Sequence, residues 1–445
     1  MNAGAPPAPP EAHVGDDGTG LRAALAIAVR GGLFAFVATA VVAQIPPLAI
    51  EIFGGGLALS TALKLGWFYE LAFHRVGIVV SGTTGLEAHL SVAFLTGTAF
   101  VVWMLFRAGR AAGAAISGSS VRSHMLAGAL VGPVYALPIG VISGLVAVQL
   151  AAGGTFVSGT VRFEGVVWQA FVFPVVLGVV AGGAGGALGA LPADARVRVW
   201  LVGGWRMLLA ALGLAAVGVL LLAAVRPQGL ATYSRVVSAN GPRSAVLLVG
   251  HHALLLPNQS FLVVAPSMGG CTSLSGPGGT VPLVCPGTLP ALDDTGLVAA
   301  VAREDVAPTS APDVPTRSMP AGYWAFLLVP AIATVGGGRW AGRTWRGRSS
   351  GRERALRGAG AGVVFAVLMG VGTWVAAIDV GLTLNASSTP ASFTLGASPV
   401  GTASLALVWG VIGGALGALL VGGQDEGTPV PVEPDEPVPP SPTSV

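Results

Sequence analysis

The sequence predicts an all-α, polytopic integral membrane protein with about eight transmembrane helices and both termini in the cytoplasm. The first observation is composition: 53% of residues are hydrophobic, only 10% are charged, and the mean hydropathy is +0.76. The second is a set of apolar runs long enough to cross a bilayer. The third is an arginine-rich loop between two such runs, which indicates which side faces the cytoplasm.

About 20 mainly apolar residues are needed to cross the hydrocarbon core as a helix. Eight stretches meet this requirement. They are 26–45, 89–106, 124–149, 166–190, 205–225, 321–338, 358–378 and 402–422. The first 20 residues hold prolines and acids with no basic region or cleavage site, so no signal peptide is expected.

The segment 244–266 is a ninth candidate for crossing, but polar residues and a proline interrupt it. This predicted outer-loop polar break consists of His251, His252, Pro257, Asn258 and Gln259. An interior proline costs about 3 kcal/mol in a helix, and polar groups at the midplane add to that cost. Interfacial, re-entrant and spanning placements of 244–266 all stay open, with Pro257 and Asn258 expected to break the helix.

The basic loop decides between eight and nine crossings. It contains seven arginines against one acid, Glu353, and lies between the sixth and seventh runs. The arginines are Arg339, Arg343, Arg346, Arg348, Arg352, Arg354 and Arg357. Anionic headgroups hold such a cluster on the cytoplasmic side, at about 1 kcal/mol per basic side chain. Nine crossings would place the loop outside the cell, whereas eight crossings keep it in the cytoplasm. Eight crossings of the inner membrane are therefore expected.

The two cysteines support the same threading. Cys271 and Cys285 lie in a Gly- and Pro-rich loop that eight crossings place outside, where thiols oxidise. A disulfide closing a loop of this size is worth about 3 kcal/mol. Two unrelated free thiols are the alternative, and nine crossings would put both in the reducing cytoplasm.

The string GGALGAL occurs at 185–191 and again at 413–419, each time where a helix is expected to meet the cytoplasm. This spacing suggests a parallel repeat of four helices plus four. The apolar outer stretches 54–82 and 229–266 would correspond, the former as an interfacial helix. The expected parts are a disordered tail at 1–20, membrane halves at 21–191 and 192–423 with an outer loop at 226–319, and a disordered acidic tail at 424–445.

Small residues recur at four-residue spacing in the fourth and eighth runs, at Gly178, Gly182 and Gly186 and at Gly410, Gly414 and Ala418. Such stripes let helix backbones approach closely, within one chain or across a dimer face. Ionisable residues are almost absent from the apolar runs, and no catalytic or nucleotide-binding motif occurs. We therefore expect no enzymatic activity, no cofactor, no bound metal and no nucleic-acid partner. Metal binding by His251 and His252 with Asp293 and Asp294 is the less favoured alternative.

Arginines among small residues follow the second helix of each half, at Arg107 and Arg110 and at Arg339 and Arg343. An outer stretch with Pro257-Asn258 is followed by Gly269-Gly270. In these features the chain resembles the actinobacterial PerM-like, division-associated membrane proteins of unknown activity and the streptophobe-type hydrophobic proteins. The outer cysteines depart from that pattern. The resemblance implies a structural or interaction role in the envelope and transfers no catalytic residues.

The expected function is that of a non-enzymatic scaffold or interaction protein of the cell envelope, associated with division or envelope maintenance. Its partners would be the lipid bilayer and other membrane or envelope proteins. The alternative is a transporter or flippase-like carrier of an uncharged or lipidic substrate. A continuous polar cavity would favour the carrier, whereas tightly packed seams of small residues would favour the scaffold. A membrane enzyme ranks third.

Overall fold

The structure is a computed structural model that describes most of the chain between Asp17 and Val421. The described ranges are 17–54, 58–82, 86–116, 120–153, 158–192, 194–225, 242–290, 316–318, 321–344, 350–384 and 391–421. The expected tail at 424–445 lies outside the described residues, as does the tail at 1–20 up to residue 16.

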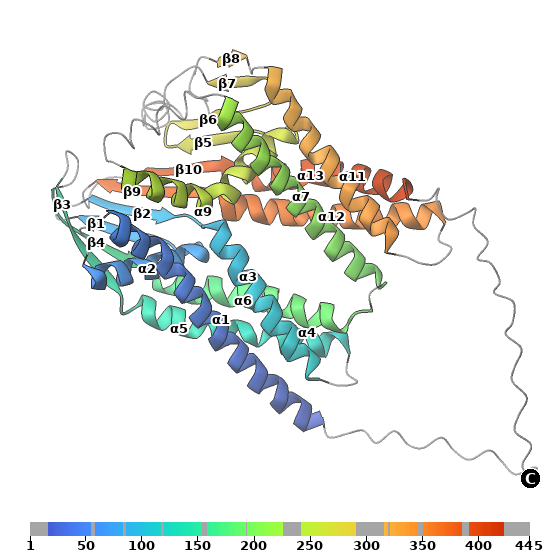
Figure 1. Cartoon of the computed structure of the whole chain (residues 1–445), viewed down its shortest axis with the longest axis horizontal. Helices are drawn as coiled ribbons and strands as arrows, with labels where there is room; N and C mark the ends of the chain where they lie inside the picture. The colour runs from blue at the N-terminus through green and yellow to red at the C-terminus, as the bar shows by residue number, and fades with distance from the viewer. Residues whose placement is uncertain are drawn as a thin grey trace, which may run out of the picture.

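Long apolar helices dominate the described residues and run along the long axis of the molecule (Figure 1). Their bounds, with one 3-10 helix η1, are α1 Asp17–Gly54, α2 Leu59–Phe73, α3 Leu95–Ala114, α4 Val121–Ala129, α5 Val131–Ser143, α6 Val167–Ala190, α7 Arg196–Val225, α9 Pro242–Ser267, η1 Ala321–Leu327, α11 Leu328–Arg343, α12 Gly351–Ala376 and α13 Pro399–Leu419. Among the described residues, six helical stretches are long and apolar enough to cross a membrane: 20–52, 121–143, 167–190, 196–221, 351–376 and 399–419. The structure is therefore that of a membrane protein.

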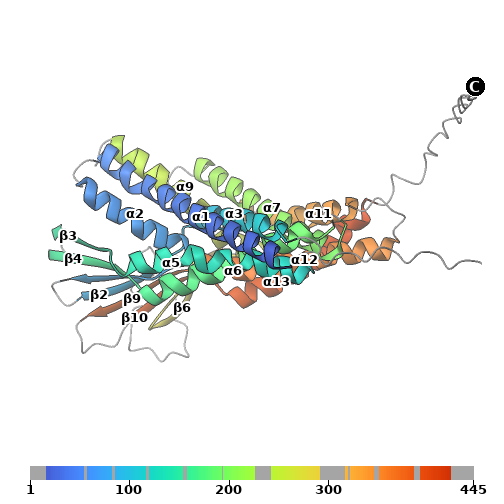
Figure 2. The ribbon, with the colours of Figure 1, turned by 90° about the horizontal axis from the view of Figure 1, so that it is seen from below.

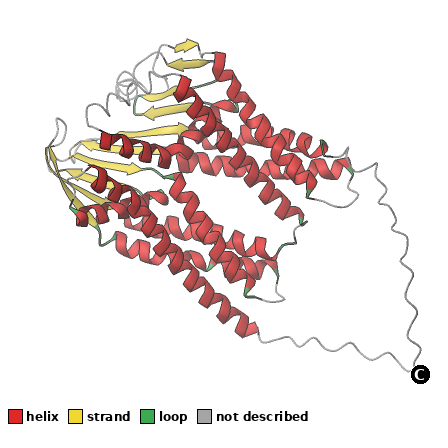
Figure 3. Ribbon diagram, in the orientation of Figure 1, coloured by secondary structure: helices red, strands yellow, loops and turns green. Residues whose placement is uncertain are grey.

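The expectation of an all-α fold is wrong, because the segments between the helices form an eight-stranded antiparallel sheet (Figure 3). The strands are β1 Ile78–Gly82, β2 Leu86–Ser91, β3 Ala147–Gly153, β4 Ser158–Gly165, β5 Thr272–Gly276, β6 Gly279–Val284, β9 Ile378–Leu384 and β10 Ala391–Ala397. A separate pair joins β7 Thr288–Pro290 to β8 Thr316–Ser318. Several strands follow a helix within a few residues: α5 ends at Ser143 and β3 begins at Ala147. Apolar residues of these strands lie next to helices in the sequence. The predicted runs 89–106 and 124–149 therefore each combine part of a strand with the adjacent helix.

The strand order is β3-β4-β1-β2-β9-β10-β5-β6. The first four strands come from the expected first half and the last four from the second. Each set has the same arrangement: the hairpin before the last helix of that half, α6 or α13, comes first, and the hairpin that follows α2 or α9 comes second. β2 pairs with β9 in the middle of the sheet, with Leu90 opposite Val380. One continuous sheet thus joins the two halves.

Each side chain along a strand points to the opposite face from its neighbour, so the sheet has an apolar face and a polar face. On the apolar face Val148, Val80 and Phe163 pack with α2, and the Phe68 and Phe163 rings lie 6.3 Å apart. Figure 2 shows α2 and α9 on the same side of the strands. The other face carries polar side chains that are about half exposed, such as those of Arg162, His89 and Glu87.

The segment 244–266 forms a continuous helix, so the expected break at Pro257 and Asn258 is wrong. Helix α9 includes Pro257. Proline has no amide to bond the carbonyl four residues earlier. The carbonyl without an amide partner is that of Ala253, which lies 3.4 Å from the Thr96 hydroxyl of α3; the same hydroxyl donates to the neighbouring Leu254 carbonyl at 2.9 Å. Contacts from α3 therefore stabilise a helix that the sequence alone disfavours.

Glycines let the helices of each half touch backbone to backbone. In the first half the backbone of Gly182 on α6 lies against Gly109 on α3 and Gly128 on α4. In the second half Gly414 on α13 lies against Gly338 on α11 and Gly358 on α12. A Cβ at any of these positions would collide with backbone of the neighbouring helix. The predicted small-residue stripes are thus seams within the chain.

The sheet lies at one end of the long axis, and the C-terminal end of α11 and the N-terminal end of α12 lie at the other (Figure 1). The disulfide also lies at the sheet end: Cys271, just before β5, is bonded to Cys285, just after β6, with an Sγ–Sγ distance of 2.01 Å. The pairing is the one expected from the sequence. It closes the β5–β6 hairpin.

Candidate functional site

A buried polar cluster lies where α2 meets α1 and α5. It consists of Thr39 from α1, Glu70 and His74 from α2 and the turn after it, and Tyr135 from α5. Thr39 Oγ1 lies 2.8 Å from Glu70 Oε1, and the Tyr135 hydroxyl lies 2.8 Å from His74 Nε2 and 3.3 Å from Glu70 Oε1. Glu70 and Tyr135 have no exposed surface, and His74 is 5% exposed.

The spacing on α2 explains why two ionisable side chains are buried side by side. Residues four apart lie on one face of a helix, and Glu70 and His74 share the face that carries Trp67 and Leu71 into the core. The imidazole Nδ1 lies 2.8 Å from the Glu70 carbonyl oxygen, which can only accept, so Nδ1 carries the hydrogen. Nε2 is therefore left to face Tyr135.

Burial controls the charge of the two ionisable groups, both of which lie outside the six candidate membrane spans. Removal from water raises the pKa of Glu70 to about 8, because desolvation outweighs its hydrogen bonds with Thr39 and Tyr135. Removal from water also lowers the pKa of His74 to about 4. Burial therefore disfavours the charged form of each side chain.

The turn after α2 carries a second charged feature. Arg75 has φ of +58°, a left-handed conformation usual for glycine at this position after a helix. Its guanidinium is 8% exposed, donates to Asp379 Oδ2 at 2.6 Å and lies 4.4 Å from the centre of the Trp374 ring. Thr394 donates to the other Asp379 oxygen at 2.8 Å. Asp379 lies at the start of β9, the strand of the second half that pairs with β2 of the first half. This ion pair therefore links the two halves.

Asn258 forms a second link between the two halves. Its side chain is 3% exposed, accepts from the Leu95 amide at 3.1 Å and donates to the Ala93 carbonyl at 2.7 Å. The first residues of a helix have amides without a partner inside the helix, and Asn258 of α9 satisfies the first amide of α3. The sequence singled out Asn258 as part of a break, whereas the structure uses it as a cap supplied by another helix.

Replacing Asn258 with alanine is expected to destabilise the protein by about 2 kcal/mol, because two buried backbone groups lose their partners. Thermal unfolding of the purified protein in detergent, followed by tryptophan fluorescence, measures the effect. Thr96→Val is the matched control: it removes a more exposed hydrogen bond between the same two helices and should cost about 1 kcal/mol or less. Equal losses for the two variants would contradict the role assigned to Asn258.

The described part of the basic loop contains Arg339, Arg343, Arg352, Arg354 and Arg357, whereas Arg346 and Arg348 lie outside the described residues. Arg339, Arg343 and Arg352 are exposed. Arg357 is 3% exposed and lies 3.9 Å from Glu353, which also lies 3.5 Å from Arg196 on α7. Part of the loop therefore packs against the bundle.

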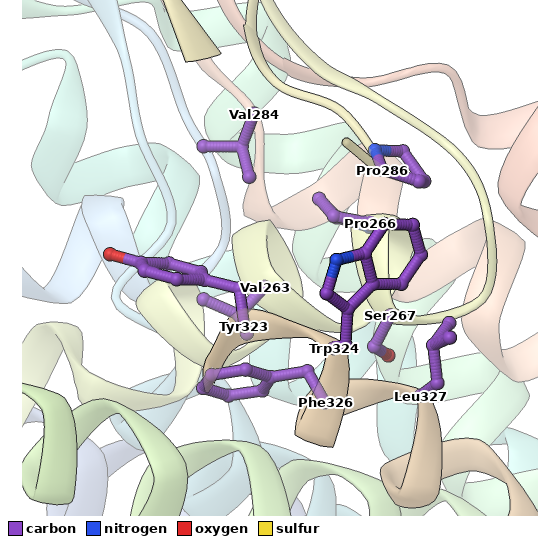
Figure 4. Close-up of a pocket in the computed structure, with 9 residues that line it drawn as sticks. All are labelled: Val263, Pro266, Ser267, Val284, Pro286, Tyr323, Trp324, Phe326 and Leu327. Carbon is purple, nitrogen blue, oxygen red and sulfur yellow. The ribbon is translucent and has the colours of Figure 1, made fainter. Parts of the chain in front are cut away.

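A small apolar pocket lies at the sheet end (Figure 4). Its volume is about 210 Å³, and it is formed by the end of α9, the end of β6 and η1. Trp324, Tyr323 and Phe326 supply its aromatic side chains, and Pro266 and Pro286 lie near Trp324 in the close-up. The polar cluster around Glu70 does not line it.

Comparison of the chain with models of known families, with characterised proteins and with solved structures finds no match.

The sequence pointed to some of these residues and missed others. Glu70, His74 and Arg75 lie in the stretch 54–82, which the sequence predicts only as an interfacial helix. Their pairing with Thr39, Tyr135 and Asp379 does not follow from that prediction. The i, i+4 spacing of Glu70 and His74 was the available signal. Of the predicted polar break, Asn258 is buried, Pro257 and Gln259 are half-buried, and the side chains of His251 and His252 lie outside the description, as do Asp293 and Asp294. Within the described residues no group of His, Cys, Asp and Glu is arranged to hold a metal ion.

Proposed function

We propose that this chain is a non-enzymatic scaffold of the cell envelope that presents its strand layer to protein partners outside the membrane. The observation that carries the proposal is the pair of glycine seams. Backbone contact at Gly182 and at Gly414 fixes the helices of each half against one another. Helices joined in this way form a rigid base, which suits a platform better than a carrier that must open and close.

The polar face of the sheet is the surface we assign to partners. Its side chains include the hydroxyls of Ser392 and Thr394, which are exposed. Arg162 pairs with Glu164 and His89 with Glu87, all about half exposed. Main-chain pairing and the cover of α2 and α9 hold the layer itself together. Proteins of division or envelope maintenance are the partner class, in line with the resemblance to PerM-like proteins.

The threading that belongs to this proposal has eight crossings, with the sheet and disulfide outside. α3 and α11 are the two crossings beyond the six stretches that meet the length and hydropathy requirement, and each packs along the last helix of its half, α6 and α13. The two halves would be copies of one unit. The matching strand order and the matching glycine contacts support this duplication.

A photo-crosslinking residue at Ser392 tests the scaffold. In intact cells Ser392 should give discrete adducts with envelope proteins, because it is exposed on the polar face. Val367, 59% exposed on α12, is the matched control and should crosslink mainly to lipid. Absence of protein adducts at Ser392 above the Val367 background, together with substrate-dependent uptake into proteoliposomes, would replace the scaffold with the carrier.

Cysteine labelling tests the threading. Ser392→Cys at the sheet end should react with a membrane-impermeant thiol reagent added to intact cells, whereas Arg352→Cys near the start of α12 should react only after lysis. The native cysteines are bonded to each other and do not interfere. Labelling of Arg352→Cys in intact cells would reverse the orientation and place the sheet in the cytoplasm.

A further inference from the structure

The turn after α2 has a counterpart after α9. In the first, the amides of Arg75 and Val76 bond the carbonyls of Ala72 and Leu71. In the second, the amides of Gly269 and Gly270 bond the carbonyls of Pro266 and Ala265, and Gly269 has φ of +104° as Arg75 has +58°. With these turns superposed in register, Glu70 corresponds to Val264 and His74 corresponds to Met268.

Glycine contacts fix the correspondence for the other two members of the cluster. Gly132 lies against Gly178 and Gly362 lies against Gly410, so Tyr135 corresponds to Phe365. In the same way Gly32 lies against Val134 and the Val131 carbonyl, and Gly204 lies against Val364 and the Ala361 carbonyl. The residue seven positions after each of these two glycines is Thr39 in α1 and Ala211 in α7.

The second half thus fills the four positions with Ala211, Val264, Met268 and Phe365, all in its hydrophobic core. The same packing is built once from polar residues and once from apolar ones. A buried polar network is no more stable than a well-packed apolar replacement, and often less so. The fold therefore does not account for the polar residues of the first half, and a different requirement keeps them there.

The hydrogen bonds of the cluster show how many hydrogens it needs. Thr39 has one hydroxyl hydrogen and two acceptors within reach, Glu70 Oε1 and the Phe36 carbonyl at 3.0 Å. Tyr135 has one hydrogen for Glu70 Oε1 and His74 Nε2. With an ionised carboxylate the network has too few hydrogens. Glu70 Oε2 is also buried with no hydrogen-bond partner among the described residues, which is costly for a carboxylate.

One added proton supplies a missing hydrogen in either of two ways. On Glu70, the carboxyl donates to Thr39, Thr39 donates to Phe36, and Tyr135 donates to His74. On His74, the imidazolium Nε2 donates to Tyr135, and Tyr135 donates to Glu70. The two arrangements interconvert when the Glu70 proton turns from Thr39 to the Tyr135 oxygen, 3.3 Å from Glu70 Oε1, and passes to it while Tyr135 passes its own proton to Nε2. No atom is gained or lost in that exchange.

We propose that Thr39, Glu70, His74 and Tyr135 form a proton-binding site, which holds one proton shared between the Glu70 carboxyl and the His74 imidazole through the Tyr135 hydroxyl. This assignment is independent of the scaffold function.

The ionisable groups on the packed elements have other partners or other locations. Arg75 follows His74 but pairs with Asp379, and Arg162 and Glu164 pair on the opposite face of the sheet. On α3, Arg107 lies over Trp103. Of the groups on α1 and α2, Lys64 is exposed and Glu51 has its own contacts. Tyr69 stacks on Phe94.

Infrared spectroscopy of the full-length protein in lipid vesicles tests the site. At pH 6 the wild-type spectrum minus that of Glu70→Gln should contain the carbonyl band of a protonated carboxylic acid. The band should fall to half its height near pH 8. Glu87→Gln, at an exposed acid of β2, is the matched control and should remove only carboxylate bands. Only carboxylate bands in the Glu70→Gln difference spectrum at pH 6, together with no imidazolium bands in the corresponding His74→Met spectrum, would show that the cluster holds no proton and would overturn the proposal.

A second variant separates proton binding from structural support. Thr39→Ala, Glu70→Val, His74→Met and Tyr135→Phe together give the first half the residues of the second. This variant should fold and unfold at a temperature equal to or above that of the wild type, and it should lack the protonated-acid band. Failure of the variant to fold, with Glu87→Gln folding normally, would make the cluster a structural requirement and would overturn the argument from the second half.

Discussion

Alanine at Gly182 or at Gly414 is expected to cost about 3 kcal/mol or more of stability and to prevent most of the protein from folding. The Cβ would collide with the Gly128 carbonyl in the first half and with the Gly358 carbonyl in the second. Backbone cannot rotate away as a side chain can, so the helices must separate and lose contacts along the seam. Yield of monodisperse protein and its thermal unfolding temperature measure the effect.

Two other helices of the bundle provide matched controls. Gly213 on α7 and Gly336 on α11 have no atom within 4 Å of an added Cβ. Alanine has the higher helix propensity, so Gly213→Ala and Gly336→Ala should be neutral or should stabilise by about 0.5–1 kcal/mol. If Gly182→Ala behaved like Gly336→Ala, the backbone contact would not be a structural requirement, and the rigid base proposed for the scaffold would lose its support.

Replacing Asp379 with alanine is expected to destabilise the protein by about 2–4 kcal/mol. The Arg75 guanidinium would stay buried without its anion, and an uncompensated buried charge is costly. Asp379 is 40% exposed, so water can partly replace it, and we expect the lower part of that range. Because the pair joins β9 to the turn after α2, proteolysis between the halves should also become faster.

Variants at Arg75 separate the loss of the ion pair from the relief of backbone strain. Arg75→Ala loses the ion pair and keeps a Cβ in the left-handed region, whereas Arg75→Gly loses the ion pair but relieves about 1–2 kcal/mol of backbone strain. Arg75→Gly should therefore be the more stable of the two. Arg162→Ala, which breaks an exposed pair on the same sheet, should change stability by less than about 1 kcal/mol. An equal effect of Arg162→Ala and Asp379→Ala on stability would show that the Arg75–Asp379 ion pair does not hold the two halves together.

Much of the helical part of this fold was predictable, because each helix depends on a local property. The runs 166–190 and 402–422 correspond to α6 and α13 within a few residues, and their glycine stripes lie in helix contacts as predicted. The cysteine pairing followed from compartment and loop size. The strands were missed because Val148 and Leu90 are apolar and adjoin helices, so a hydropathy window counts them with the span. Only pairing partners far along the chain make them strands, such as Phe163 for Val148 and Val380 for Leu90.

The sequence by itself determined that this chain belongs in a membrane, where its long helices run and which glycines lie in their seams, because hydropathy and side-chain size act over one or two turns of a helix. The tertiary structure decided the rest. It brought Thr39, Glu70, His74 and Tyr135 into one buried cluster, paired Arg75 with Asp379, and turned Asn258 into a cap for a distant helix. These contacts join residues 31 to 304 positions apart. Their energies depend on burial and on partners that no local pattern records.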